Sequence, residues 1–158
     1  MLSPTGSILN FLREIHLPFH LTCLHNGTFM PGMEIVEGTL LIDLDKLKHP
    51  GDLLHEAGHI AITSAVRRRW LSGDMKKAGH QGGEEMAAIA WSWAALTFIN
   101  LAPNIVFHAQ GYKGGSENII AAFSNGLGFG YPLLVSWSMC EQPDTHKGFP
   151  EMKRWLRG

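Results

Sequence analysis

The amino-acid sequence predicts an α+β fold, with a small antiparallel sheet or hairpin followed by a mainly helical domain. Three observations favour it. Short β-prone segments lie before residue 45, apolar segments with helical spacing follow residue 50, and glycine or proline residues separate the two kinds. With 158 residues, 45% hydrophobic and 17% charged, the chain is long enough to bury a core, and it contains no visible repeat or linker. We therefore expect a single domain covering residues 1–158.

One helix and the strands are expected in the N-terminal third. Residues 8–15 have the apolar spacing of a short helix, and residues 17–24 are a candidate strand. Residues 34–36 and 39–43 are β-prone and flank a Glu-Gly pair, which has the length of a two-residue turn. These two segments are therefore predicted to form an antiparallel hairpin.

The helical part is expected to begin directly after the His-Pro-Gly break at residues 49–51. Asp52 follows as the N-cap or first-turn acid of the first long helix. The predicted helices cover residues 52–69, 84–100, 104–109, 116–125 and part of 132–139. Residues 70–83 and 111–116 are predicted loops, and residues 152–156 are expected to close the fold.

Charge and composition argue against a nucleic-acid partner. The net charge is −1 with neutral histidines, and Lys and Arg form no extended basic face. The short run Arg67-Arg68-Arg69 stands at the predicted end of the first long helix, where it complements the negative end of the helix dipole. We therefore expect this protein to bind no nucleic acid.

No membrane span, secretory signal or disulfide framework is predicted. The longest apolar stretches, residues 87–102 and 119–139, are interrupted by polar, glycine or proline residues, whereas a span needs roughly 20 apolar residues. The N-terminus lacks a basic segment followed by an apolar run, so we expect a cytoplasmic location. Cys23 and Cys140 lie far apart without paired spacing, and buried free thiols are their expected state.

His55-Glu56-Ala57-Gly58-His59 is the most informative segment of the chain. Residues four apart lie on the same face of a helix, so the imidazoles of His55 and His59 can reach one ion. Glu56, next to the first histidine, is placed to contact a water on that ion as a general base. A neutral imidazole suits zinc, and zinc lowers the pKa of its bound water to about 7. The pattern therefore predicts a Zn²⁺ site with a hydrolytic role for Glu56.

A catalytic zinc site normally has a third protein ligand, and the helix predicted at residues 84–100 begins with two acids. Glu85 lies on a stripe of small residues that includes Ala88. The stripe of Glu84 includes the large indole of Trp91, which would hold a neighbouring helix away. A zinc–oxygen bond of about 2 Å requires two helices to approach closely. Glu85 is therefore the expected third ligand, with Glu84 as the alternative.

The order His55-Glu56-x-x-His59 followed by Glu85-x-x-Ala88 resembles the pattern of gluzincin metallopeptidases. The small size of the chain is similar to that of the single-domain minigluzincins. The resemblance implies a zincin-like fold and zinc-dependent hydrolysis of peptide bonds. It also implies a peptide or protein substrate, with Glu56 as the general base.

Two further roles are expected of residues outside the ligand set. The resemblance implies a group that orients a zinc-bound imidazole, and Ser92 or Asp52 is expected to supply it. His108 and Tyr112 lie in a glycine-rich segment and are candidate hydrogen-bond donors to a developing oxyanion. His80 is expected to line the cleft.

The leading interpretation is a zinc metallopeptidase. The alternative is a non-catalytic zinc-binding regulatory or interaction module built on the same fold. In that alternative the ligands hold the metal but no bond is cleaved, so turnover that depends on Glu56 distinguishes the two.

Overall fold

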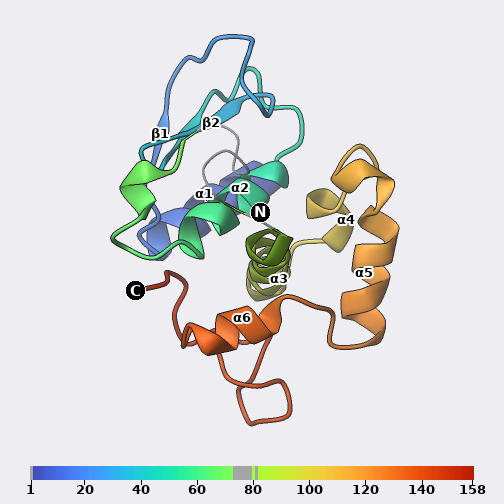
Figure 1. The fold of residues 1–158 in the computed structure, drawn as a ribbon. Coiled ribbons are helices and arrows are strands. Elements are labelled where there is room, and N and C mark those ends of the chain that lie inside the picture. Colours follow the sequence, from blue (N-terminus) through green and yellow to red (C-terminus); the bar gives the residue numbers. More distant parts are fainter. Residues whose placement is uncertain (1, 73–79, 81) are drawn as a thin grey trace.

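The structure is a computed structural model that describes residues 2–72, 80 and 82–158. Its helices and small sheet confirm the α+β class. The helices are α1 (Pro4–Glu14), α2 (Asp52–Ala61), α3 (Gly82–Phe98), α4 (Pro103–Val106), α5 (Ser116–Asn125) and α6 (Tyr131–Ser136), with short 3-10 helices η1 (Arg68–Trp70) and η2 (Tyr112–Gly114). The strands are β1 (Phe19–Leu21), β2 (Met33–Val36) and β3 (Thr39–Ile42) (Figure 1).

The strands β2 and β3 form the predicted antiparallel hairpin, with Met33 opposite Ile42. Glu37 (φ 50°) and Gly38 (φ 76°) are both left-handed, as the tight turn of a two-residue hairpin requires. A Cβ atom on Gly38 would lie 2.5 Å from the carbonyl oxygen of Arg68, so only glycine fits here.

The sheet is mixed, and the expectation of an antiparallel sheet is wrong for β1. The strand order is β1-β3-β2, and β1 runs parallel to β3. β1 occupies the edge of β3 that the hairpin leaves open: the Leu40 amide donates to the Pro18 carbonyl (3.0 Å), and the Thr22 amide to the Ile42 carbonyl (2.8 Å). The direction of β1 is set by the path of the connection to β2, which leaves no local signal in the sequence.

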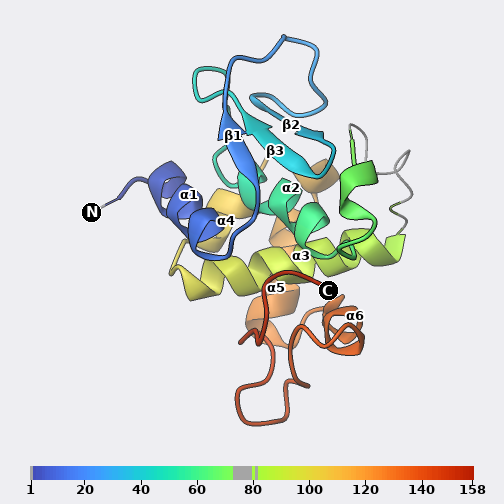
Figure 2. The same ribbon diagram turned by 90° about the vertical axis from the view of Figure 1, so that its left-hand side faces the viewer.

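The helix α3 crosses the middle of the molecule and separates two layers (Figure 2). The sheet, α1 and α2 lie on one side of it, and α5 and α6 lie on the other. The C-terminal segment returns from α6 and ends against the first side, where the Trp155 ring meets that of Phe11 and the Arg157 amide donates to the Ala61 carbonyl. One connected apolar core joins these elements, and Leu12, Ile42, Leu53 and Trp91 within it are all 0% exposed. These four residues come from α1, β3, α2 and α3, so their burial holds α2 between the sheet and α3.

The helix α2 ends at Ala61 rather than at residue 69. Arg68 Nε donates to the Ile60 carbonyl (3.3 Å), and the Arg157 amide donates to the Ala61 carbonyl (2.9 Å). These long-range bonds satisfy carbonyl groups that a further turn of helix would use. Arg68 therefore complements the negative end of α2, as expected of the arginine run, but it does so from η1.

The ends of the chain also differ in detail from the prediction. α1 begins earlier than expected because Ser3 caps it, accepting a hydrogen bond from the Gly6 amide (3.1 Å). The C-terminal segment closes the fold as expected, since the Trp91 indole donates to the Trp155 carbonyl (2.9 Å). Most of the predicted loop at residues 70–83 lies outside the described residues.

No helix in the described part of the chain is long and apolar enough to cross a membrane. Both cysteines are free thiols. Cys140 is buried as expected, whereas Cys23 is exposed because it follows the edge strand β1.

Candidate metal centre

His55 and His59 lie one turn apart on α2 and direct their Nε2 atoms to one point. The two Nε2 atoms are 3.3 Å apart, and the rings meet edge to face with centroids 4.8 Å apart. The side chain of His59 is 2% exposed and that of His55 is 14% exposed. The helix spacing of the motif therefore produces the pair that the sequence predicts.

Glu85, in the first turn of α3, joins the two histidines. Its Oε1 is 3.1 Å from His55 Nε2, and its Oε2 is 3.0 Å from His59 Nε2. His55, His59 and Glu85 form a group of potential metal ligands, and Glu84 does not belong to it. The structure thus brings together the three residues predicted as ligands.

The close approach of α2 and α3 at Gly58 makes this arrangement possible. A Cβ atom on Gly58 would lie 3.0 Å from the Ala88 carbonyl oxygen and 3.3 Å from Trp91 Cε3. The sequence argument expected the indole of Trp91 to hold a neighbouring helix away, and this is wrong. Trp91 packs directly against Gly58, where the absent side chain leaves room for the ring.

One ligand atom from each of the three residues lies within 4.8 Å of the other two, which is close enough for one ion to reach all three. Ligand atoms 2.0–2.1 Å from zinc at tetrahedral angles are about 3.3 Å apart, and the two Nε2 atoms have this spacing. Each Nε2 atom lies against a different oxygen of the Glu85 carboxylate, at 3.1 Å for His55 and 3.0 Å for His59. Two imidazoles and one carboxylate also leave a fourth position for water, as in catalytic zinc sites. The donor set therefore fits zinc.

The ligand group is strongly coupled electrostatically. Burial lowers the pKa of His55, but the hydrogen bond and charge of Glu85, with the charges of Glu56 and Asp52, outweigh it, so that this pKa is raised. For His59, burial dominates and the pKa is lowered. Burial also acts to raise the pKa of Glu85, yet the close contacts of its oxygens with the imidazoles of His55 and His59 bring that pKa well below its usual range. Glu85 is therefore ionised at neutral pH, as a metal-ligating carboxylate must be.

Glu56 follows His55 on α2 and is 6% exposed. Its charge acts on two other groups of the centre. It is one of the charges that oppose the effect of burial on the pKa of His55. Burial raises the pKa of Tyr112 well above its usual value, and the charges of Asp52, Glu85 and Glu56 raise it further. The carboxylate of Glu56 is therefore within electrostatic reach of both the ligand group and the Tyr112 hydroxyl.

His80 binds the side of the His59 ring that faces away from Glu85, and Thr63 binds the other ring nitrogen of His80. His59 Nδ1 is 2.8 Å from His80 Nδ1, and His80 Nε2 is 2.9 Å from Thr63 Oγ1. Burial, together with the nearby His59, lowers the pKa of His80 to about 4, so this side chain is neutral at pH 7. The sequence analysis expected His80 to line the cleft but identified no residue that it would bind. A single histidine outside the motif helix has no regular spacing from which a partner could be predicted.

Neither of the two groups expected to orient a ligand imidazole contacts one. The Ser92 hydroxyl donates to the Ala88 carbonyl (2.8 Å), which is the usual bond of a serine inside a helix. Asp52 is a first-turn acid of α2 as predicted, although Gly51 is the N-cap, and its Oδ1 lies 2.7 Å from His108 Nε2. His80 takes the place expected of Ser92 or Asp52.

His108 contacts Asp52 and His49. Its Nε2 is engaged by Asp52, and its ring stacks on His49 with centroids 3.8 Å apart and an angle of 15°. The sequence assigned no role to His49. His49 lies shortly before Asp52 in the chain, and this proximity was the sequence signal that both residues could contact the His108 ring.

Tyr112, from η2, lies directly against the ligand group. Its ring meets that of His55 edge to face, with centroids 5.1 Å apart. Its hydroxyl is buried and has no hydrogen-bond partner among the described residues. A buried polar group without a partner costs about 1–3 kcal/mol, so this hydroxyl is suited to bind a substrate atom. His108 Nδ1 is also buried without a partner among the described residues, so what favours Tyr112 of the two predicted oxyanion donors is its contact with the ring of His55.

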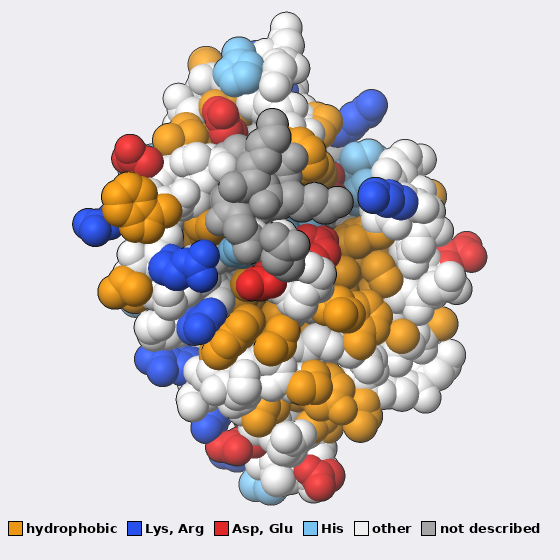
Figure 3. Space-filling view, in the orientation of Figure 1, with side chains coloured by type: hydrophobic (Ala, Val, Ile, Leu, Met, Phe, Trp, Pro, Cys, Tyr) orange, Lys and Arg blue, Asp and Glu red, His pale blue; other side chains and the backbone are white. Residues whose placement is uncertain are grey.

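The end of α3 that carries Glu85 faces the viewer in Figure 3. Acidic side chains appear near the middle of this face, and apolar side chains gather toward α5 and α6. The ligand group thus lies next to a surface of mixed acidic and apolar character.

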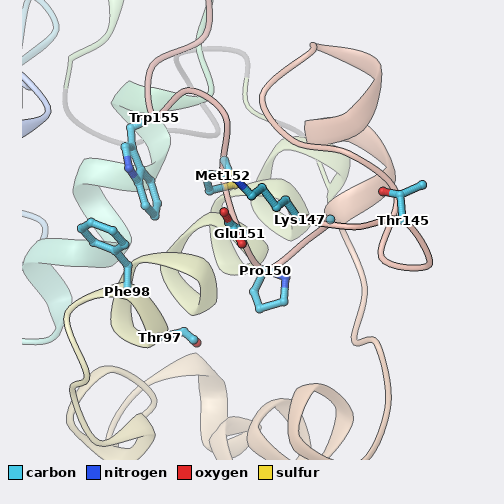
Figure 4. A pocket seen from close by; sticks show the side chains of 9 residues that line it. Thr97, Phe98, Thr145, Lys147, Pro150, Glu151, Met152 and Trp155 are labelled. Carbon is cyan, nitrogen blue, oxygen red and sulfur yellow. The ribbon is translucent and has the colours of Figure 1, made fainter.

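A separate cavity of about 550 Å³ lies at the other end of α3, against the C-terminal segment (Figure 4). It is lined by Thr97, Phe98, Thr145, Lys147, Gly148, Pro150, Glu151, Met152 and Trp155. None of the ligand residues contributes to it, so this cavity is distinct from the candidate metal centre.

No model of a known protein family matches the chain, and neither do the curated proteins or the solved structures compared with it. The functional argument therefore depends on the residues of this chain.

Proposed function

We propose that this protein is a zinc-dependent peptidase in which Glu56 is the general base. The observation that carries the proposal is the group formed by His55, His59 and Glu85, in which the two Nε2 atoms are 3.3 Å apart and lie 3.1 and 3.0 Å from the two oxygens of the Glu85 carboxylate. Two helices supply these donors, and a buried carboxylate directly follows the first ligand. This is the set of groups that metal-assisted hydrolysis requires.

Each side chain has a separate task in this proposal. A zinc ion held by His55, His59 and Glu85 would polarise the carbonyl group of the peptide bond and would lower the pKa of water to about 7. Glu56 accepts a proton as the water oxygen attacks the carbonyl carbon, and it passes that proton to the leaving nitrogen as the C–N bond breaks. Tyr112 donates a hydrogen bond from Oη to the carbonyl oxygen as negative charge develops on it.

Two features support a peptide as the substrate. The order of Glu56 and the three ligands along the chain resembles that of gluzincin metallopeptidases. The surface beside the ligand group carries apolar side chains (Figure 3), and Met86, directly after Glu85, is 45% exposed. An apolar surface of this kind suits the side chains of an extended peptide.

The test compares zinc-loaded wild-type protein with Glu56→Gln on an unfolded protein substrate, with fragments identified by mass spectrometry. Gln retains the shape of Glu but cannot accept the proton, so we expect zinc to remain and cleavage to fall by about 100-fold or more. Glu117→Gln is the control, because Glu117 is an exposed acid in the first turn of α5. It should cleave as the wild type does.

Three outcomes would contradict the proposal. A wild-type protein that binds no zinc would refute the metal centre. Equal cleavage by Glu56→Gln and wild type would refute the general base. Zinc binding without cleavage of any substrate tested would refute the peptidase and favour the non-catalytic zinc-binding module.

A further inference from the structure

Thr63, His80 and His59 form a chain of hydrogen bonds that ends at the candidate metal centre. Thr63 Oγ1 lies 2.7 Å from the His59 carbonyl oxygen and 2.9 Å from His80 Nε2, and His80 Nδ1 lies 2.8 Å from His59 Nδ1. The three residues are only 5%, 6% and 2% exposed. Since water has little access to these bonds, the available protons determine the direction of each one.

The direction at Thr63 follows from its single hydroxyl proton. A peptide carbonyl can only accept, so Thr63 donates this proton to the His59 carbonyl. The regular helical donor to that carbonyl would be the Thr63 amide, which instead donates to the Ile60 carbonyl (3.2 Å). Toward His80 the hydroxyl oxygen can therefore only accept, and His80 must carry its proton on Nε2.

The proton position on His80 decides that on His59. With a proton on Nε2, the Nδ1 of neutral His80 is an acceptor, so His59 donates to it from Nδ1. A neutral His59 protonated on Nδ1 has a lone pair on Nε2, and this atom is 3.0 Å from Glu85 Oε2. This lone pair is the donor that a metal ion requires at Nε2. The bond chain thus prepares His59 as a metal ligand.

We propose that Thr63 and His80 are positioning residues that hold the His59 ring and select its metal-binding tautomer. The inference rests on the proposed zinc site and assigns a role to two residues outside the ligand group. The hydrogen bonds of both residues lead to His59, so they act on the metal through that ligand. Residues that hydrogen-bond to a metal ligand in this way typically change metal affinity by about 10- to 100-fold.

Zinc affinity, measured by competition with a chromophoric chelator, gives the first readout. Thr63→Val keeps the shape but removes the hydroxyl, and we expect it to bind zinc about 10-fold more weakly. Thr63→Ser restores the hydroxyl and should restore the affinity. Thr97→Val is the matched control, because Thr97 also donates to a carbonyl four residues earlier (Trp93, 2.8 Å), but at an exposed position on α3. It should bind zinc as the wild type does.

A double-mutant cycle tests whether Thr63 acts through His80. His80→Ala should weaken zinc binding by about 10- to 100-fold. Adding Thr63→Val to His80→Ala should cause little further loss, because the hydroxyl then has no imidazole to orient. Additive losses would contradict the proposed chain.

The tautomer of His59 gives a second readout that needs neither zinc nor a variant. Side-chain nitrogen chemical shifts of the metal-free wild type, at mildly alkaline pH, should show His59 protonated on Nδ1. Protonation on Nε2 would overturn the inference, as would wild-type zinc affinity in both Thr63→Val and His80→Ala. If the wild type binds no zinc, the proposed function fails, and the tautomer still decides the direction of the bond chain.

Discussion

Gly58→Ala tests the helix contact on which the candidate metal centre depends. The new Cβ atom would lie 3.0 Å from the Ala88 carbonyl oxygen and 3.3 Å from Trp91 Cε3. Neither neighbour has room to retreat. The oxygen belongs to the backbone of α3, and Trp91 is 0% exposed, with the rings of Phe11 and Trp155 at 5.9 and 5.7 Å. The two helices must therefore separate by roughly a few tenths of an ångström.

Two opposing effects set the change in stability. Overpacking of a core costs about 1–3 kcal/mol, and replacing Gly by Ala within a helix recovers about 1 kcal/mol. We expect a net loss of about 1 kcal/mol, which lowers Tm by about 2–4 °C in a protein of this size.

The same separation moves Glu85 on α3 away from His55 and His59 on α2. Metal–ligand distances tolerate a deviation of only about 0.2 Å. The displacement expected for Gly58→Ala is of this size, so we expect zinc affinity to fall about 10-fold.

Thermal unfolding of the metal-free protein measures the first effect of Gly58→Ala, and chelator competition measures the second. Gly83→Ala is the control, because its Cβ atom would make an ordinary contact of 3.5 Å with Leu133. It should leave Tm and zinc affinity nearly unchanged. A Gly58→Ala protein that melts at a higher temperature and binds zinc as tightly as the wild type would refute the reasoning.

Two more predictions concern the ligand choice and the thiols. Glu85→Ala removes a ligand, so it should weaken zinc binding by more than the roughly 10- to 100-fold typical of residues that hydrogen-bond to a ligand. Glu84→Ala should bind zinc as the wild type does. If chelator competition shows the reverse, Glu84 is the ligand and Glu85 is not. Burial, with the charge of Glu141, raises the pKa of the Cys140 thiol to about 11, so at mildly alkaline pH its reactive thiolate is scarce. Mass spectrometry after alkylation should therefore show rapid labelling of exposed Cys23 and slow labelling of Cys140 that accelerates as the pH approaches 11; equal rates would contradict this environment.

The parts of the site that could be predicted are those that a helix or a turn determines locally. His55 and His59 share a face because one helical turn separates them, wherever the rest of the chain lies. The hairpin was predictable for a similar reason, since Glu37 and Gly38 are the right length for a tight turn between two β-prone segments.

Glu85 is an intermediate case. Small residues along one face of α3 indicated a close helix approach, and that face does meet Gly58. The accompanying argument about Trp91 was wrong, because a large ring can fill the space that a glycine on the facing helix leaves open. Periodicity identified the face, whereas the packing of the actual side chains decided how near the two helices lie.

The sequence by itself determined the histidine pair, the carboxylate beside it, the hairpin and the α+β class, because each depends on local spacing. Only the tertiary structure decided that β1 runs parallel to β3, that α2 ends where Arg68 and Arg157 bind its carbonyl groups, and that His80 lies within hydrogen-bond distance of His59. His80 lies 21 residues from its partner in the chain. Contacts over such distances depend on burial and on which donors and acceptors remain free after folding, and no local pattern of residues encodes that information.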